Sequence, residues 1–370
     1  MIKILTVIGA RPQIIKAAAI SRAVREHFSD KIEERILHTG QHYDTNMSQV
    51  FFDELCIPAP DYNLGVGSGS HGTQTAKMIE GIESVLNSEH FDGIILYGDT
   101  NSTLAGAVAA AKLHVPVFHI EAGLRSFNMA MPEEQNRIVC DQLSSILFAP
   151  TQTAVDNLAA EGLTTSTAVF QNGKGRQVIK SGDVMYDNAL YFSALAEQKS
   201  HILKDLSIST DNYILATIHR DFNTDNPERI NSIFKALSSI ADEHGIPIVL
   251  PLHPRTKKYL PPELSPRITI IPPASFFDIL TLEKNAKIVM TDSGGVQKEA
   301  FFFSRPSVIL RPETEWVEII NHNAGILADA NYDRIIRAYD SLSRHSIYFP
   351  SLFGDGKASH IILQSIINFL

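Results

Sequence analysis

Cysteine and tryptophan are scarce in this chain of 370 residues, which holds two cysteines and one tryptophan. Cys56 and Cys140 cannot build a disulfide framework or a cysteine zinc site, which fits a reducing compartment. No apolar run approaches the roughly 20 residues of a membrane-spanning helix. The start, residues 1–9, is typical of a strand and a glycine turn rather than of a signal peptide. We therefore expect a cytoplasmic protein with no membrane partner.

Basic residues are in the minority, with 32 Lys and Arg against 41 Asp and Glu and a net charge of -9. This balance argues against nucleic acid as a partner, although local arginines can still bind a phosphorylated small molecule. The glycine-rich stretch 67–72 follows no predicted core strand, so it is not a dinucleotide fingerprint. No metal-ligand spacing occurs among the histidines near it and near the strand ends: His71, His119, His219 and His253. We expect no metal and no cofactor.

The sequence does contain short apolar runs that alternate with longer amphipathic stretches, which is typical of βα units and a parallel sheet. The chain length suggests about two domains. Predicted strands are residues 2–8, 35–39, 93–97, 115–120, 146–148, 213–218, 246–250, 268–271, 287–291 and 307–310. Predicted helices are residues 17–28, 73–86, 102–113, 227–244 and 295–303. The fold class is therefore α/β, with two doubly wound, Rossmann-like domains.

The boundary between the two domains is expected in the polar, glycine-bearing stretch 171–187. We place the N-terminal domain at residues 1–172 and the C-terminal domain at residues 173–352. Residues 353–370 are expected to end in a closing helix, which can pack on either half.

Motifs rich in charged, polar and glycine residues begin where the predicted strands end, which is where ligands bind in open α/β sheets. In the first half these motifs are residues 9–12, 98–102 and 121–125, and in the second half 219–221, 253–255, 292–295 and 311–316. After the strand at 115–120, acids and bases stand beside an anion clamp: Glu121, Arg125, Glu133, Glu134 and Arg137. We expect both sheets to direct their motifs at one cleft.

The segment Asp292-Ser293-Gly294-Gly295 places glycines between a strand and a helix, where backbone N–H groups bind phosphate. The alternative is a plain helix start, capped by one of the two polar residues. Basic residues at other strand ends favour the phosphate site: Arg11, His219 and Arg220. Glu299, one turn into the helix, can accept hydrogen bonds from ribose hydroxyls, or it can be a solvated carboxylate.

Taken together, these motifs resemble the non-hydrolysing UDP-N-acetylglucosamine 2-epimerases, in the family's order and over nearly the whole chain. The motifs that carry the resemblance are Gly9 to Gln13 with Lys16, Gly98 to Thr100, His119 to Arg125, Pro132 to Arg137, and Asp292 to Gly295 with Gln297 and Glu299. The resemblance implies a glycosyltransferase-B-type architecture, with UDP bound chiefly by the C-terminal domain and sugar chemistry supplied by the N-terminal domain. It also implies that the closing helix packs on the N-terminal domain, that the protein is a homodimer, and that it serves surface polysaccharide synthesis in a bacterium.

The family inverts C2 of the sugar. UDP leaves by elimination and returns after a proton has reached C2 from the opposite face, which requires acid and base groups and stabilisation of the departing diphosphate. The resemblance implies that Asp99, Glu121 and Glu133 are the catalytic carboxylates and that His219 stands near the diphosphate. It assigns substrate and UDP binding to a larger set: Arg11, Lys16, Arg137, His253, Phe276, Ser293, Gly294, Gly295, Glu299 and Arg311. Phe276 matches the aromatic residue of the uracil pocket, with core packing as its alternative.

Two segments depart from the housekeeping members of the family. Residues 41–44 and 313–318 look more like the branch that acts on modified UDP-sugars, including UDP-2,3-diacetamido-glucuronic acid. Asp44 replaces a glutamine of the members regulated by UDP-N-acetylglucosamine, so the resemblance does not extend to allosteric activation. Three other hypotheses stay open: a UDP-sugar glycosyltransferase of the same fold, a hydrolase that releases N-acetylmannosamine, and a non-catalytic sensor.

Overall fold

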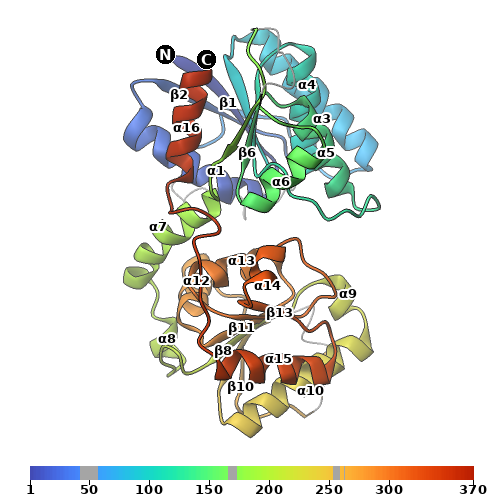
Figure 1. The fold of residues 1–370 in the computed structure, drawn as a ribbon, viewed down its shortest axis with the longest axis vertical. Helices are drawn as coiled ribbons and strands as arrows, with labels where there is room; N and C mark the ends of the chain where they lie inside the picture. The colour runs from blue at the N-terminus through green and yellow to red at the C-terminus, as the bar shows by residue number, and fades with distance from the viewer. Residues whose placement is uncertain (42–56, 166–172, 253–258, 262) are drawn as a thin grey trace. The chain divides into compact units, whose positions relative to one another are not determined.

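The computed structural model describes residues 1–41, 57–165, 173–252, 259–261 and 263–370. Contacts within the chain divide it into two units, the first formed by Met1–Asn188 with Ser351–Leu370 and the second by Ala189–Pro350. Figure 1 shows that each unit is a sheet flanked by helices. Both units are therefore α/β folds.

The sheet of the first unit has the strand order β3-β2-β1-β4-β5-β6-β7, and all of its pairings are parallel. Because the order runs outward in both directions from β1 and β4, the sheet is doubly wound. Helix α4 contacts both α3 and α5, and α1 contacts α16, so the two groups make separate layers. The strands are β1 (Ile2–Ile8), β2 (Ile32–His38), β3 (Tyr62–Asn63), β4 (Gly93–Tyr97), β5 (Val117–Ile120), β6 (Ile146–Ala149) and β7 (Gln177–Lys180). The helices are α1 (Arg11–Ala23), η1 (Val24–Phe28), α3 (His71–Ser88), α4 (Asn101–Lys112), α5 (Pro132–Leu143), α6 (Gln152–Ala160) and α16 (Ala358–Phe369).

The sheet of the second unit repeats this order, β10-β9-β8-β11-β12-β13, and is also parallel. One layer holds α10 and α15, and another holds α8, α12 and α13. The strands are β8 (Ile214–Thr217), β9 (Ile248–Pro251), β10 (Ile268–Ile271), β11 (Ile288–Thr291), β12 (Ser307–Ile309) and β13 (Gly325–Leu327). The helices are α8 (Ile202–Asp205), α9 (Asp221–Thr224), α10 (Pro227–His244), α12 (Phe276–Asn285), α13 (Gly294–Phe302), α14 (Val317–Asn321) and α15 (Tyr332–Arg344). The predicted α/β class with two Rossmann-like sheets is thus confirmed.

The first unit extends to Asn188, beyond the boundary expected at residues 172 and 173. Strand β7 pairs with β6, so this polar stretch forms the edge of the first sheet. Helix α7 (Val184–Lys199) then runs from the first unit into the second. The side chain of Asp187 accepts hydrogen bonds from the backbone N–H groups of Ala358 and Ser359, at 3.0 and 2.8 Å, and so caps α16. The closing helix belongs to the first unit.

Central strands are buried on both faces, as the apolar runs predict. All residues of β4, β5 and β6 in the first unit are buried. The predicted helix 17–28 begins earlier, at Arg11, because Pro12 lies in the first turn, where a missing N–H costs nothing. Helices α5, α6 and α15 and strands β7 and β13 were not predicted.

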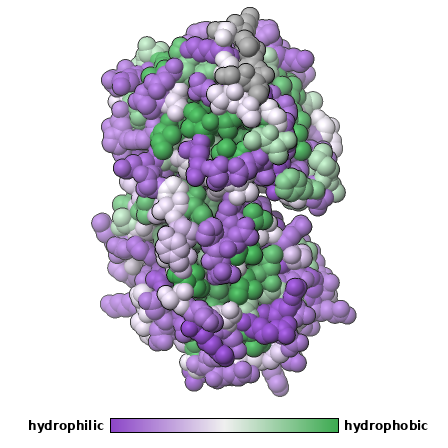
Figure 2. Space-filling view, viewed as in Figure 1, coloured by the Kyte–Doolittle hydropathy of each residue, from purple (hydrophilic) through white to green (hydrophobic). Residues whose placement is uncertain are grey.

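Figure 2 shows hydrophilic side chains bordering the apolar ones on the face that it draws. Within the described ranges, no helix is long and apolar enough to cross a membrane.

Candidate functional site

An ion pair joins two strand-end motifs in the first unit. Lys16 Nζ, on α1, lies 2.7 Å from Glu121 Oε2, which follows β5. Both side chains are 11% exposed. Gly98, after β4, completes the group, since a Cβ there would lie 3.1 Å from Lys16 Nζ. The ends of β4 and β5 and the start of α1 therefore converge.

Glu121 adopts a backbone conformation that side chains usually avoid. Its φ is 72°, in the left-handed region that costs a non-glycine residue about 1 kcal/mol or more. Gly123 follows with φ 79°, and a Cβ there would lie 2.3 Å from the Ala154 carbonyl oxygen. Such strain is retained where the surrounding structure enforces it, and it aims the Glu121 carboxylate at Lys16.

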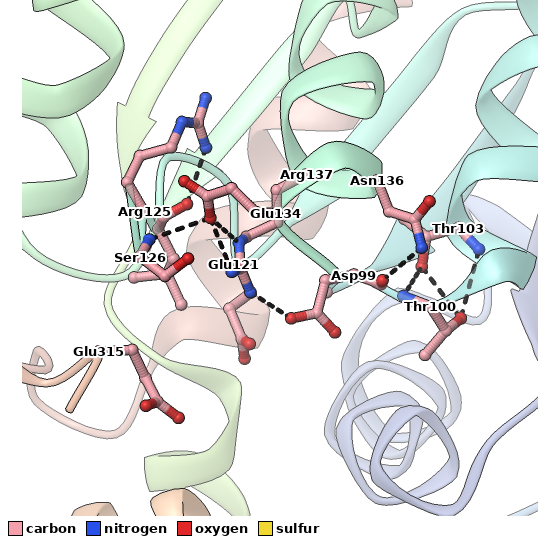
Figure 3. Close-up of polar contacts among 12 residues, drawn as sticks. Asp99, Thr100, Thr103, Glu121, Arg125, Ser126, Glu134, Asn136, Arg137 and Glu315 are labelled. Carbon is pink, nitrogen blue, oxygen red and sulfur yellow. Dashed lines mark hydrogen bonds and ion pairs between the residues drawn. The ribbon is translucent and has the colours of Figure 1, made fainter. Parts of the chain in front are cut away.

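Asp99 is the second carboxylate of this group. It forms an ion pair with Arg137, on α5, as Figure 3 shows. Burial raises the pKa of Asp99 above its usual 3.8; Lys16 and Arg137 oppose this shift, and Glu121 and Glu133 add to it. A carboxyl group with a raised pKa among cations is suited to proton transfer.

The two neighbouring glutamates at the start of α5 have different environments. Glu134 is 1% exposed and accepts hydrogen bonds from the backbone N–H groups of Ser126 and Phe127, at 2.9 and 3.0 Å. It also lies 2.7 Å from Arg137 Nη2. Glu133 is exposed in the first helical turn. Glu134 thus anchors the loop and Arg137 (Figure 3), whereas Glu133 keeps an accessible carboxylate.

Arg125 is not available as the anion clamp that the sequence suggested. Its guanidinium donates to both carboxylate oxygens of Glu161 at 2.7 Å and to the Leu124 carbonyl at 2.8 Å. It also lies 2.8 Å from Asp141 Oδ2. Because these partners use its donors, the expectation for Arg125 is wrong. Arg11 remains exposed at the start of α1.

A braced turn carries Arg11. The side-chain oxygen of Gln13 accepts from the N–H groups of Gly9 and Ala10, at 2.9 and 3.1 Å, and its amide donates to the Tyr97 carbonyl at 3.0 Å. A Cβ at Gly9 would lie 2.1 Å from Thr39 Oγ1, so only glycine fits. This bracing ties the first turn to the end of β4.

The predicted phosphate turn of the second unit lies at the start of α13. Ser293 Oγ accepts from the Val296 N–H at 3.4 Å, so Ser293 is the helix N-cap. Gly294 and Gly295 form the first positions of the helix, where N–H groups have no intrahelical acceptor. A Cβ at Gly294 would lie 2.3 Å from Glu315 Oε1, so the Glu315 carboxylate lies close to the backbone of Gly294. The capped helix start is thus confirmed, and the phosphate site stays a prediction.

Asp292 is fully buried and serves the frame of this turn. Its carboxylate accepts from the backbone N–H groups of His219 and Arg220 and from Asn223 Nδ2, all at 3.1 Å. Asn223 Nδ2 also donates to the Leu310 carbonyl at 3.0 Å. Asp292 therefore joins the ends of β8, β11 and β12. The His219 ring is 51% exposed, with Nδ1 3.4 Å from Asp292 Oδ1.

The loop after β12 brings further polar groups to α13. Arg311 Nη1 lies 3.1 Å from Glu315 Oε2, and Thr314 Oγ1 donates to Gln297 Oε1 at 2.7 Å. Gln297 is fully buried, and its Nε2 has no hydrogen-bond partner among the described residues. Sequence reasoning did not include Gln297 in the site. Its position one turn after Ser293 was the available signal.

The remaining predicted residues of the second unit are partly buried or undescribed. Glu299 is half-buried on α13. Phe276 begins α12 and packs edge-on against Phe192, with ring centroids 5.2 Å apart. His253 lies outside the described residues. Across the parts of the chain that are described, no group of three or more His, Cys, Asp or Glu is placed to hold a metal ion.

A family model described as UDP-N-acetylglucosamine 2-epimerase matches residues 24–367. The chain belongs to this family. The family resemblance inferred from the motifs is thus confirmed, and the relatives are epimerases, a class of isomerase.

Individual relatives cover the chain from end to end. UDP-2,3-diacetamido-2,3-dideoxy-D-glucuronate 2-epimerase of Pseudomonas aeruginosa is 48% identical over 98% of each chain. UDP-N-acetylglucosamine 2-epimerase of Methanocaldococcus jannaschii is 39% identical over 98% of each chain.

Solved structures agree. The crystal structure of the M. jannaschii enzyme in complex with UDP-GlcNAc and UDP matches with a TM-score of 0.83, over 99% of this chain and 100% of that one. A UGT transferase from Siraitia grosvenorii, at 12% identity and a TM-score of 0.63, shares the fold alone. The glycosyltransferase-B type of fold is thereby confirmed.

Proposed function

We propose that this protein epimerises C2 of a UDP-activated 2-acetamido sugar without hydrolysing it. The observation that carries the proposal is the convergence of Asp99 and Glu121 with Lys16 and Arg137 at three strand ends of one sheet. Binding alone does not require two carboxylates at one place. Inversion of a carbon that bears hydrogen does require an acid and a base.

The chemistry follows from the weak acidity of the C2 proton. No carbonyl group next to C2 stabilises a carbanion, so the bond from C1 to the diphosphate oxygen breaks as the proton leaves. The products of this step are UDP and an unsaturated 2-acetamido sugar. Return of UDP to C1, with a proton added to the other face of C2, completes the inversion.

We assign the proton-transfer roles from the environments of the acids. Asp99, whose pKa is raised, is the acid that delivers a proton to C2. Glu121, held against Lys16, is the base that removes one. Because the reaction runs in both directions, the two exchange roles in the reverse reaction. Glu133, exposed at the start of α5, is the third carboxylate of the proposed set.

The departing diphosphate needs positive charge and N–H donors. We assign UDP binding in the second unit to the α13 turn and to residues around it: Ser293, Gly294, Gly295, His219, Arg311, Glu299, Phe276 and His253. Gln297 joins this set because its buried amide nitrogen, Nε2, has no hydrogen-bond acceptor among the described residues, so it can donate to a bound ligand. Arg11, Lys16 and Arg137 supply cations from the first unit.

For the substrate, we propose UDP-2,3-diacetamido-2,3-dideoxy-glucuronate ahead of UDP-N-acetylglucosamine. Identity to the P. aeruginosa relative with the former name is 48%, against 39% to the M. jannaschii relative with the latter. The segments 41–44 and 313–318 point the same way. A homodimeric state, a cytoplasmic location and the absence of nucleic-acid and membrane partners belong to the same proposal.

Product analysis of the purified protein with each nucleotide sugar tests the proposal. We expect two intact epimeric nucleotide sugars, resolved by proton NMR, and faster turnover of the diacetamido-uronate. Release of free sugar and UDP would instead show a hydrolase. Unchanged substrate, with transfer only when an acceptor is added, would show a glycosyltransferase.

A further inference from the structure

We propose that Asp141 is a positioning residue of the reaction, whose buried carboxylate fixes the separation of the two turns that carry Asp99 and Glu121. The inference rests on the proposed function, because that function makes the separation matter. Asp141 lies on α5 and is fully buried, so it acts through other residues.

The first link runs through His119 to the Asp99 turn. Asp141 Oδ1 lies 2.7 Å from His119 Nδ1, and His119 Nε2 lies 2.8 Å from the Gly98 carbonyl oxygen. A carbonyl oxygen can only accept, so Nε2 carries a hydrogen. The carboxylate accepts from the other nitrogen, so His119 is a buried imidazolium that donates on both sides. The ring thereby fixes the carbonyl group of Gly98, the residue directly before Asp99.

The second link runs from the other carboxylate oxygen to the Glu121 turn. Asp141 Oδ2 accepts from the Gly123 N–H at 3.1 Å and lies 2.8 Å from Arg125 Nη1. Gly123 stands two residues after the strained Glu121, and the hydrogen bond holds its positive φ. One carboxylate group thus binds both turns, each through a different oxygen.

Burying these charged groups costs more free energy than burying apolar side chains in their place would. A buried carboxylate and imidazolium lose their hydration, and apolar side chains of similar volume often hold a core as well. What apolar packing does not supply is directional fixation of two backbone groups. Proton transfer needs such fixation, since a displacement of about 1 Å can lower a rate about 100-fold.

The experiment compares Asp141→Asn with the matched control Glu161→Gln. Glu161 holds the opposite side of the Arg125 guanidinium, at 2.7 Å, and within the described residues its carboxylate makes no hydrogen bond to the Gly98 or Gly123 backbone. Asparagine keeps one acceptor but turns an NH2 group toward a donor. We expect kcat of Asp141→Asn to fall about 100-fold, with the KM and the dissociation constant of UDP within about threefold of wild type. We expect Glu161→Gln to keep kcat within about twofold. Both are assayed at a temperature where circular dichroism shows them folded.

A folded Asp141→Asn with wild-type kcat would overturn the proposal, as would an equal loss in Glu161→Gln. Should Asp141→Asn fail to fold, His119→Gln replaces it, with the same expected fall in kcat and the same unchanged KM; an unchanged kcat would again overturn the proposal.

The ¹⁵N spectrum of histidine-labelled protein tests the link without any assay of activity. We expect both ring nitrogens of His119 to be protonated at pH 8, and a neutral ring would overturn the proposal. If the wild type epimerises neither nucleotide sugar, the proposed function fails, and the spectrum still decides whether the Asp141 link exists.

Discussion

Replacement of Glu134 by glutamine tests how firmly the acidic site is held. The Glu134 carboxylate is buried and accepts from two backbone N–H groups and from Arg137 Nε and Nη2, the last two at 3.1 and 2.7 Å. Glutamine has the same shape, but it lacks the charge and presents an NH2 group to donors. Breaking a buried ion pair on one side costs about 3–5 kcal/mol. We expect the free energy of unfolding of the first unit to fall by about 3 kcal/mol at pH 7.

The pH dependence of this loss has a defined sign. Burial alone would raise the pKa of Glu134, but hydrogen bonds from Ser126, Arg137 and Phe127 outweigh it and hold the pKa below 4.5. A carboxylate with a depressed pKa stabilises the fold above its unfolded pKa, and this contribution is lost as the pH falls through the folded value. The difference between wild type and Glu134→Gln is therefore largest at neutral pH and shrinks below about pH 4.5.

Urea unfolding at pH 7 and at several acidic pH values measures this difference. The control is Gln135→Ala, which removes one neutral hydrogen bond from an exposed side chain to the Met129 carbonyl and should cost about 1 kcal/mol or less. Equal stability of wild type and Glu134→Gln at pH 7 would refute the reasoning. So would a gap that does not narrow in acid.

Three further predictions concern the two sites. Glu121→Gln should keep UDP binding in calorimetry but lose most turnover, and unchanged turnover would remove Glu121 from the catalytic set. Asp99→Asn should be inactive yet as stable in urea at pH 7 as the wild type, or more stable, because a raised folded pKa means that ionised Asp99 destabilises the fold above pH 3.8; clear destabilisation would contradict this. Gly294→Ala should weaken UDP binding more than Gly295→Ala, because its methyl group would displace the Glu315 carboxylate, whose Oε1 lies 2.3 Å from the added Cβ and which pairs with Arg311, whereas the nearest atom to a Cβ at Gly295 is 3.8 Å away; equal affinities would be inconsistent with the turn geometry.

The apolar runs predicted the central strands because those strands are buried on both faces, and a strand buried on both faces is apolar along its whole length. β7 escaped prediction because an edge strand tolerates polar residues, and Gln177–Lys180 is only half-buried. The boundary shifted with it. The sequence places the start of helix α1 too late, at residue 17, although proline is accepted in the first turn of a helix.

The strand-end rule located the acidic site, but the sequence could not rank the acids within it. Glu133 and Glu134 are adjacent in sequence, and only the backbone path of residues 126 and 127 makes the second of them structural. Arg125 is neutralised by Asp141 and Glu161, sixteen and thirty-six residues away, which no local pattern reveals. Asp141 itself carries no motif signature; its role becomes visible only when two strand ends are seen to meet on one carboxylate.

The most direct test of the account follows the hydrogen at C2. Wild-type protein is incubated with UDP-2,3-diacetamido-2,3-dideoxy-glucuronate in D2O, and the recovered nucleotide sugars are examined by proton NMR. We expect solvent deuterium at C2 of both epimers and no free sugar. Epimers that retain their original C2 hydrogen, or a substrate that returns unlabelled and unchanged here and with UDP-N-acetylglucosamine, would contradict the assignment of proton transfer to Asp99 and Glu121.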